Sequence, residues 1–562
     1  MARGVKSGHF IIAVVLVFFA VSLYLAFNPI RLGQGDAINQ SSEGKSFLSK
    51  RDSDFLLLVS EKRITEEGNF YSRDWSYAWV NTLMQEAGAF SVMNADKPLE
   101  LKGRVVIVSK SALSMPAELR NEIKKFTENG GILVIEEPTA DWDFVSDIEN
   151  RKSAEVQNRS ILWGDFGKGS VIMLNFNYGI YLTSMQQGTP NSDYSVSDRY
   201  GRPDMSDTQE LVLNREMLDN PVPYADIMER TIFNIIENQK PVPRLWYFPG
   251  NYSGAVIVSH DEDFYGDATT YLFDYEDSIN ATATFFIVAE SEITKEAVER
   301  MGKNADIGLH WDKNKGFSIW KFRPFRFDTG LSRQAAQMQS KTPQKIIANR
   351  LHYLDWGDDY TKTFRNLHQA GFEIDSSYGP NIGRGYLFGT GQPFYALDKN
   401  GLVITVLEMP FQTQETWGGV DEEYMELLIR ESSERYHEVI ISNYHPHYST
   451  EGGNSRALLE KNFELAGKYS QWVTNFREYS LYLKKRGDVS MMSMFNGGKL
   501  IISEESSYET TIIAPYEYSG LKVLKIEVNE DVAESSKVSV EGAEYALIKI
   551  PSGRNKIVVG YG

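Results

Sequence analysis

The sequence contains no cysteine among its 562 residues. This absence excludes disulfide bonds, thiolate metal ligands and cysteine nucleophiles, so any metal site must be built from His, Asp, Glu or Asn. The chain is also poor in positive charge, with 58 Lys and Arg against 76 Asp and Glu and a formal net charge of -18. Because a surface that binds phosphates needs positive potential, this balance argues against nucleic acid or anionic lipid as a partner. A neutral or cationic ligand fits it better.

One uncharged apolar run, FIIAVVLVFFAVSLYLAFN, occupies residues 10–28. At ~1.5 Å per residue a helix of this length just crosses a bilayer, and basic Arg3 and Lys6 ahead of it favour a cytoplasmic N-terminus. We therefore expect residues 1–30 to form a cytoplasmic tip and a single transmembrane helix, with the bulk of the protein extracytoplasmic. A cleaved signal peptide is the alternative. Residues 31–52 are polar and contain Gly and Ser, which is typical of a flexible stalk.

Residues 53–240 alternate between short β-branched runs and amphipathic helical segments. Such alternation predicts an α/β domain with a parallel sheet and crossover helices. The stretch MPAELRNEIKKFTENGGILVIEEP resembles part of the glutamine-amidotransferase-like and related flavodoxin-like domains. Catalytic members of that group carry a nucleophilic cysteine after a strand, which this chain lacks. The resemblance therefore implies a structural or sugar-positioning role rather than amidotransferase activity.

A proline-bearing linker, QKPVPRLWYFPGNY, leads into a second unit at residues 245–487, which holds seven of the eight histidines. Beyond it, residues 488–562 consist of short alternating runs separated by turn residues. That pattern predicts a small antiparallel β domain of the sandwich type. The expected architecture is thus α/β, with two α/β domains followed by a β domain.

Polar clusters follow β-rich runs of the second unit. A parallel α/β sheet presents functional side chains at the carboxyl ends of its strands, and burying such groups without partners is costly. A lone histidine at a strand end is usually a hydrogen-bonded structural residue, but several such ends together predict one site on the rim of a barrel. The residues are Asp261 and Asp263 in SHDED, His310 in ADIGLH, Arg350 and His352 in NRLHYL, Asp375 in AGFEIDSS, and His445 and His447 in ISNYHPH.

The order SHDED, ATFFIV, DIGLH, RLHYL, AGFEIDSS and ISNYHPH resembles the polysaccharide deacetylase family of carbohydrate esterases over residues 250–485. The resemblance implies a (β/α) barrel with seven strands or a distorted version of it. It also implies metal-dependent hydrolysis of N-acetyl groups on a polysaccharide or other N-acetylated glycan. Zinc is the metal expected first, with nickel, cobalt or manganese as alternatives.

The resemblance further implies a role for each matching residue. Asp261 matches the catalytic base, while Asp263, with Glu262 as the alternative, matches the metal-binding aspartate. His310 matches the first histidine ligand. The remaining matches are Arg350, which positions the base, Asp375, which supports the catalytic histidine, and His445, which protonates the leaving group.

One position departs from the family pattern. The family's second histidine ligand lies four residues after the first, where this sequence has Asn314. An amide oxygen binds zinc more weakly than imidazole does, and His352 is our candidate for the missing nitrogen. The departure leaves open a catalytically degenerate protein that binds glycan or assists surface assembly. A glycoside hydrolase on a similar barrel, with Asp261 and Glu408 as its acid pair, is a third reading.

Overall fold

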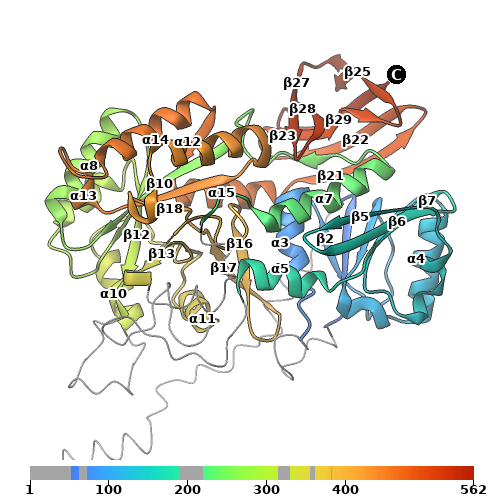
Figure 1. Ribbon diagram of the computed structural model, residues 1–562, viewed down its shortest axis with the longest axis horizontal. Coiled ribbons are helices and arrows are strands. Elements are labelled where there is room, and N and C mark those ends of the chain that lie inside the picture. Colours follow the sequence, from blue (N-terminus) through green and yellow to red (C-terminus); the bar gives the residue numbers. More distant parts are fainter. Residues whose placement is uncertain (1–51, 62–72, 189–218, 314–329, 355–360, 381–382) are drawn as a thin grey trace, which may run out of the picture. The chain divides into compact units, whose positions relative to one another are not determined.

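The computed structural model describes residues 52–61, 73–188, 219–313, 330–354, 361–380 and 383–562. In Figure 1 the chain runs from blue through green and yellow to red. Most of its strands form three modules: a mainly parallel sheet in the first part, a larger mainly parallel sheet in the middle, and two antiparallel sheets towards the C-terminus. A separate two-stranded parallel sheet pairs β8 (Asp219–Asn220) with β15 (Arg384–Gly385).

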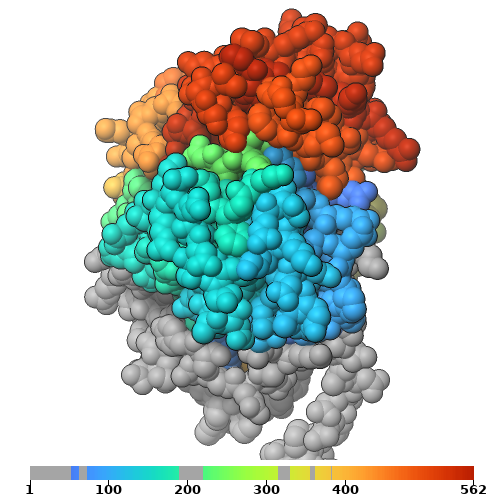
Figure 2. Space-filling model, turned by 90° about the vertical axis from the view of Figure 1, so that its right-hand side faces the viewer, coloured from blue at the N-terminus to red at the C-terminus, as the bar shows by residue number. Residues whose placement is uncertain are grey.

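The first module is a seven-stranded sheet in the order β2-β1-β3-β4-β7-β6-β5. Its first five strands are parallel in the order 2-1-3-4-5 of flavodoxin-like sheets, whereas β6 and β5 form an antiparallel extension. Alternate side chains of β1 enter separate cores, with Leu57 on one face and Leu56 and Leu58 on the other. Helices α3, α5 and α7 cover the first face and α4 the second. The residues of this module make one close-packed blue and teal surface in Figure 2. The bounds are β1 (Phe55–Val59), β2 (Ser91–Asn94), β3 (Val105–Val108), β4 (Ile132–Glu136), β5 (Glu149–Val156), β6 (Arg159–Phe166), β7 (Gly169–Leu174), α3 (Ala78–Thr82), α4 (Ala117–Glu128), α5 (Tyr178–Gln186) and α7 (Tyr224–Gln239).

The second module is a ten-stranded sheet in the order β16-β17-β14-β13-β12-β11-β10-β19-β18, with β20 paired beside β11 on β10. All its pairs are parallel except that of β16 with β17. Helices such as α8, α12 and α14 accompany the strands in Figure 1. The bounds are β10 (Gly254–Glu262), β11 (Thr284–Ile287), β12 (Asp306–Trp311), β13 (Ala348–Leu351), β14 (Ile374–Asp375), β16 (Phe394–Leu397), β17 (Val403–Glu408), β18 (Thr413–Gln414), β19 (Val439–Tyr444), β20 (Gln471–Thr474), α8 (Gly266–Ser278), α12 (Glu422–Glu431), α13 (Pro446–Ser449) and α14 (Arg456–Lys468).

The predicted barrel is wrong in one respect, because this sheet is an open half-barrel in the described residues. Its edge strand β16 is capped by side chains of the first module. Asn81 exchanges hydrogen bonds with the backbone of Tyr395 at 3.0 and 2.9 Å, and Gln187 does the same with Leu397 at 2.7 and 2.8 Å. Since these amides satisfy backbone groups that a further strand would need, the edge is closed to additional pairing.

The third module consists of two antiparallel sheets with a shared apolar core. The four-stranded sheet includes β9 (Arg244–Leu245) from the linker, which pairs with β23 through Ile512 and Ile513. The linker is thus part of this module. The remaining bounds are β21 (Ser490–Asn496), β22 (Lys499–Ser506), β23 (Thr510–Pro515), β24 (Glu517–Tyr518), β25 (Leu521–Val528), β26 (Asp531–Val532), β27 (Ser535–Val540), β28 (Ala543–Ile550) and β29 (Gly553–Tyr561).

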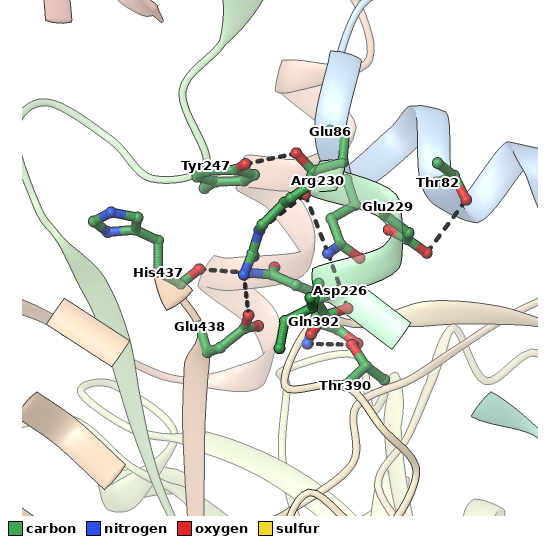
Figure 3. A network of polar contacts seen from close by, with 12 residues as sticks. Thr82, Glu86, Asp226, Glu229, Arg230, Tyr247, Thr390, Gln392, His437 and Glu438 are labelled. Carbon is green, nitrogen blue, oxygen red and sulfur yellow. Dashed lines mark hydrogen bonds and ion pairs between the residues drawn. The ribbon is translucent and has the colours of Figure 1, made fainter. Parts of the chain in front are cut away.

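A set of buried ionisable side chains, which we call the junction cluster, connects elements of the modules (Figure 3). Arg230 of α7 lies between two carboxylates: its Nε is 3.2 Å from Glu86 Oε1 and its Nη1 is 2.7 Å from Glu438 Oε1. Arg244 of β9 approaches the other oxygen of Glu86 at 2.6 Å. Helix α7, the linker and the residue before β19 are therefore held by shared ion pairs. The cluster comprises Glu86, Asp226, Glu229, Arg230, Glu237, Arg244 and Glu438.

The expectation of a transmembrane helix is not supported. Residues 10–28, on which it fell, lie outside the described residues. Within the described residues, no helix combines the length and the apolar character needed to cross a bilayer. We therefore correct the fold class, removing the transmembrane helix, and we do not retain the single-pass membrane location.

Candidate metal centre

Strand β10 carries two aspartates of the site at its carboxyl end. All nine of its residues are buried, and it pairs with β11 and β20 on one side and with β19 on the other. Asp261 lies within the strand, and Asp263 follows it with a side chain that is 22% exposed. This strand thus ends in two covered carboxylates, Asp261 and Glu262, which the accessible carboxylate of Asp263 follows.

Asp263, His310 and His352 form a group whose ligand atoms all lie within 4.8 Å of one another. Asp263 Oδ1 is 3.3 Å from His310 Nε2 and 3.4 Å from His352 Nε2. No hydrogen-bond donor in the described part of the chain satisfies this buried oxygen. Two imidazole nitrogens and one carboxylate oxygen are a typical donor set for a catalytic zinc ion that keeps a position open. These residues therefore fit a divalent metal ion.

The outer nitrogen of each histidine lies beside an oxygen atom. His310 Nδ1 lies 3.1 Å from the carbonyl oxygen of Arg350 and donates its proton there, so Nε2 faces Asp263. Metal-ligating histidines commonly donate their second N–H to a carbonyl or carboxylate in this way. His352 Nδ1 lies 3.2 Å from Asp312 Oδ2, but this pair lacks hydrogen-bond geometry. A hydrogen bond therefore fixes the ring of His310, and the Asp312 carboxylate lies beside the ring of His352.

The carboxylate of Asp261 accepts hydrogen bonds from two side chains. Arg350 Nη1 donates to Oδ1 at 3.0 Å and Asn443 Nδ2 donates to Oδ2 at 2.8 Å. Burial on its own would raise the pKa of Asp261, but the charges of Arg350, His310 and His445 and the Asn443 hydrogen bond outweigh it and lower the pKa to about 2. Asp261 is therefore ionised at neutral pH, and its orientation is fixed.

His445 faces the opposite side of the Asp263 carboxylate. Its Nε2 is 3.5 Å from Asp263 Oδ2, and its Nδ1 donates to Glu415 Oε1 at 2.8 Å. Burial opposes protonation, yet the hydrogen bond to Glu415 and the nearby carboxylates raise the pKa of His445 to about 9. At neutral pH the site therefore pairs a deprotonated Asp261 with a protonated His445, as acid–base chemistry requires.

Most of the described residues singled out in the sequence meet here, and His447 lies beside His445 with ring centroids 5.9 Å apart, but Asp375 does not join them. Asp375 is in register with Asn349 on one neighbouring strand and Glu408 on the other. It accepts a hydrogen bond from Asn349 Nδ2 at 2.7 Å, and the supporting contact to His445 comes from Glu415 instead. Asn314 lies outside the described residues. The residues brought together are Asp261, Asp263, His310, Arg350, His352 and His445.

Three contributors were missed in the sequence. Asn443 lies in β19 two residues before His445, which directly follows that strand, and Asp312 lies two residues after His310, directly after the end of β12. The period-two alternation of strands could have indicated both. Glu415 had no such signal, because it follows the two-residue strand β18 in a left-handed conformation with φ of 53°.

Neither the family models nor the curated proteins contain a match to this chain. Solved structures do match. A putative polysaccharide deacetylase from Mycobacterium smegmatis is 15% identical, covering 43% of this chain and 93% of its own, with a TM-score of 0.32. Puue allantoinase is 13% identical, with coverages of 43% and 93% and a TM-score of 0.31. A probable polysaccharide deacetylase from Pseudomonas aeruginosa PAO1 is 13% identical, with coverages of 42% and 92% and a TM-score of 0.31.

Polysaccharide deacetylases are thus among the structural neighbours of the chain, at low identity and low TM-score. The likeness of residues 53–240 to amidotransferase-like domains finds no support in these matches and stays a prediction.

Proposed function

We propose that the protein is a metal-dependent hydrolase that removes N-acetyl groups from a polysaccharide. The observation that carries the proposal is the convergence of three kinds of group around Asp263. These are a His–His–Asp ligand set, an ionised Asp261 held by Arg350, and a protonated His445. Amide hydrolysis needs this combination: an activated water, an acceptor for its proton, and a donor for the departing amine.

Asp263, His310 and His352 would hold the ion. When bound, it would supply Lewis-acid chemistry, lowering the pKa of a water molecule and polarising the acyl oxygen. Zinc suits the donor set best, and nickel, cobalt and manganese accept the same ligands. The buried carbonyl of Arg350 accepts a hydrogen bond from His310 Nδ1 and keeps that ring in place, and the Asp312 carboxylate lies 3.2 Å from His352 Nδ1.

The protein's own groups divide the proton transfers. Asp261 accepts the proton of the attacking water, while Arg350 and Asn443 hold its carboxylate in one orientation. His445 donates a proton from Nε2 to the departing amine nitrogen. Because Glu415 accepts the Nδ1 proton at 2.8 Å, the proton available for transfer is the one on the side of Asp263.

The test is Asp261→Asn, which removes the acceptor and keeps the shape. Release of free amine from an N-acetylated oligosaccharide should fall by about 10²–10⁴-fold, while circular dichroism and thermal unfolding show a folded protein. An unchanged rate would refute the mechanism. A wild-type protein that carries metal and binds glycan but releases neither amine nor acetate would favour the degenerate, glycan-binding alternative.

The glycoside hydrolase reading is disfavoured by the position of Glu408. This side chain is fully buried, and it accepts a hydrogen bond from the backbone N–H of Tyr378 at 2.9 Å. Burial and the neighbouring Asp375 raise its pKa well above the ordinary range. A covered residue of this kind does not reach a glycosidic bond, so we expect free amine and no new reducing end among the products.

A further inference from the structure

A cavity, which we call the rear cavity, lies at the amino end of β12, whereas the candidate metal centre lies at the carboxyl end. Its volume of about 470 Å³ is within the range of about 300–1,000 Å³ that small-molecule sites occupy. Asp306, the first residue of β12, lines the cavity, and the metal ligand His310 follows four residues later on the same strand. At about 3.3 Å per residue, their backbone positions are about 13 Å apart. The rear cavity is therefore separate from the metal centre.

Hydrogen bonds between segments hold the wall of the rear cavity in one shape. Asn304 Nδ2 donates to Asp277 Oδ1 at 2.7 Å, which joins the turn before β12 to the end of α8. The hydroxyl of Thr282 donates to the carbonyl oxygen of Asn304 at 3.0 Å, and Asn475 Nδ2 donates to the Thr282 hydroxyl at 2.9 Å. Asn475 directly precedes α15 (Phe476–Arg486). A wall fixed in this way costs a ligand little ordering entropy on binding.

The lining of the rear cavity is polar almost throughout. Its nonpolar residues are the small Ala281, Gly302 and Ala305, and no aromatic or large aliphatic side chain contributes to it. Sites for apolar ligands are lined mainly by hydrophobic and aromatic side chains. The rear cavity therefore suits a polar ligand.

The carboxylates of the rear cavity already have donors within the protein. Asp277 accepts the hydrogen bond from Asn304 given above, and Asp306 Oδ1 accepts one from Arg477 Nε at 2.9 Å. Glu478 Oε2 accepts one from the hydroxyl of Thr474 at 3.1 Å. Buried or half-buried carboxylates that lack donors are the groups that require a cation. These carboxylates do not require one.

The start of α15 does not call for an anion either. The backbone N–H of Phe476 donates to Thr284 Oγ1 at 3.2 Å, and that of Glu478 donates to Asn475 Oδ1 at 2.9 Å. A helix binds an anion through free N–H groups in its first turn. Here protein side chains accept two of these groups, and the carboxylate of Glu478 repels negative charge.

Two side chains at the rim keep unused hydrogen-bonding groups. Those of Asn280 and Lys303 make no hydrogen bond or ion pair with any residue in the described part of the chain. The amide of Asn280 offers donors and an acceptor, and the ammonium group of Lys303 offers three donors. Hydroxyl groups both donate and accept, so a ligand with several hydroxyl groups matches this mixture.

We propose that the rear cavity binds an uncharged, hydroxyl-rich ligand, namely a sugar of one to a few units, as a second and non-catalytic site. The two sites face opposite ends of one sheet, so a short oligosaccharide does not occupy both. A polysaccharide held at the rear cavity would raise the local concentration of acetylated units at the metal centre. That consequence rests on the proposed function, whereas the binding site does not.

The test titrates the metal-free, full-length protein with cellotriose, which is uncharged and carries no N-acetyl group, by calorimetry and saturation-transfer NMR. The wild type should bind it at one site. Asn280→Gly and Lys303→Met should each weaken this binding by about three- to tenfold, because each removes hydrogen-bonding groups at the rim. Asn280 has φ of 55°, which glycine adopts without strain. Asn158→Gly is the matched control at an exposed asparagine with φ of 59°, and it should bind cellotriose as the wild type does.

Three results would overturn the inference: no binding of cellotriose, binding that neither rim variant weakens, or tighter binding of the cationic glucosamine trimer or the anionic galacturonic acid trimer. Asp261→Asn and His352→Ala should bind cellotriose with the affinity of the wild type. A loss in these two variants would place the sugar at the metal centre and also overturn the inference. A protein that binds cellotriose at the rear cavity but never releases amine would refute the proposed function and leave this site standing.

Discussion

The candidate metal centre and the junction cluster both gather charged side chains in the interior, yet their acids behave oppositely. At the metal centre Arg350 and the histidines lower the pKa of Asp261 to about 2, overcoming the effect of burial. In the junction cluster burial raises the pKa of Asp226, Glu229 and Glu438. The first site keeps its carboxylates ionised, and the second favours their neutral forms.

The two sites differ in solvent exposure and in their numbers of acidic and basic groups, and these differences explain the opposite pKa shifts. Asp263 is 22% exposed, whereas Arg230 and Glu438 are fully buried against each other. The junction cluster, as defined above, holds five carboxyl groups and two guanidinium groups. Protonation of some of the carboxyl groups therefore reduces its excess negative charge. An interior cluster sealed from solvent joins elements together, and one that solvent reaches is suited to chemistry.

Removing a cation from the junction cluster should have the largest effect on the stability of the protein. Arg230→Met leaves Glu86 and Glu438 without their shared cation and should lower the free energy of unfolding by about 3–5 kcal/mol in urea titrations. Arg554→Met is the matched control, because Arg554 and its partner Glu505 are 84% and 57% exposed, and it should cost at most about 1 kcal/mol. Equal losses would show that burial does not distinguish the two pairs.

Binding of a metal ion at the metal centre should raise the stability of the folded protein. At free zinc one hundred times its dissociation constant, the full chain should gain about 2.7 kcal/mol of stability over the metal-stripped protein, seen as a higher Tm. His352→Ala should lose most of this gain, since it removes one of three ligands. His368→Ala, at a histidine that contacts Thr405 at 2.9 Å instead, should keep it. An identical zinc response in both variants would contradict the ligand set.

Glu415→Gln tests the support of His445. The variant keeps the shape of the side chain but removes the charge that raises the pKa of His445. We expect kcat to fall by about tenfold to a hundredfold, with metal content and KM close to those of the wild type. A rate equal to the wild-type rate would mean that Glu415 does not position the proton donor.

The smallest expected effect concerns the pH dependence of stability. Burial is the largest cause that raises the pKa of Glu229 in the folded state. The folded protein therefore binds a proton more tightly than the unfolded chain, so the stability from this group is present at low pH and is lost as pH rises above about 4.5. Glu229→Gln removes this titration. The stability of the variant should fall less than that of the wild type as pH rises from 5 to 8, and parallel pH profiles for the two proteins would refute the assignment.

The strand ends of the second module were readable from the sequence because polar clusters follow apolar runs at βα spacing. This pattern placed Asp261, His310 and His445 on one edge of a sheet. It could not predict the partners of Asp375. The alternation of side chains along a strand predicts which face of the sheet a side chain lies on, but it does not predict which residues lie beside it. Register decides this, and it sets Asp375 between Asn349 and Glu408.

Contacts between segments that are far apart in the chain could not be predicted from the sequence. The edge strand β16 is capped by Asn81 and Gln187, which precede it by more than 200 residues. Glu415 reaches His445 from a two-residue strand with a left-handed backbone, which produces no periodicity. The antiparallel strands β5 and β6 likewise extend a sheet for which only parallel pairing was expected.

The pairing of β9 with β23 constrains how the polypeptide matures on the ribosome. Arg244 and Leu245 find their strand partners only at Ile512 and Ile513, and Ser53 forms a parallel bridge with Met491. Segments made early must therefore wait for the last part of the chain to emerge before their hydrogen bonds are complete. A nascent chain stalled before residue 490 would lack these partners, and its early modules would be exposed to proteases until synthesis ended.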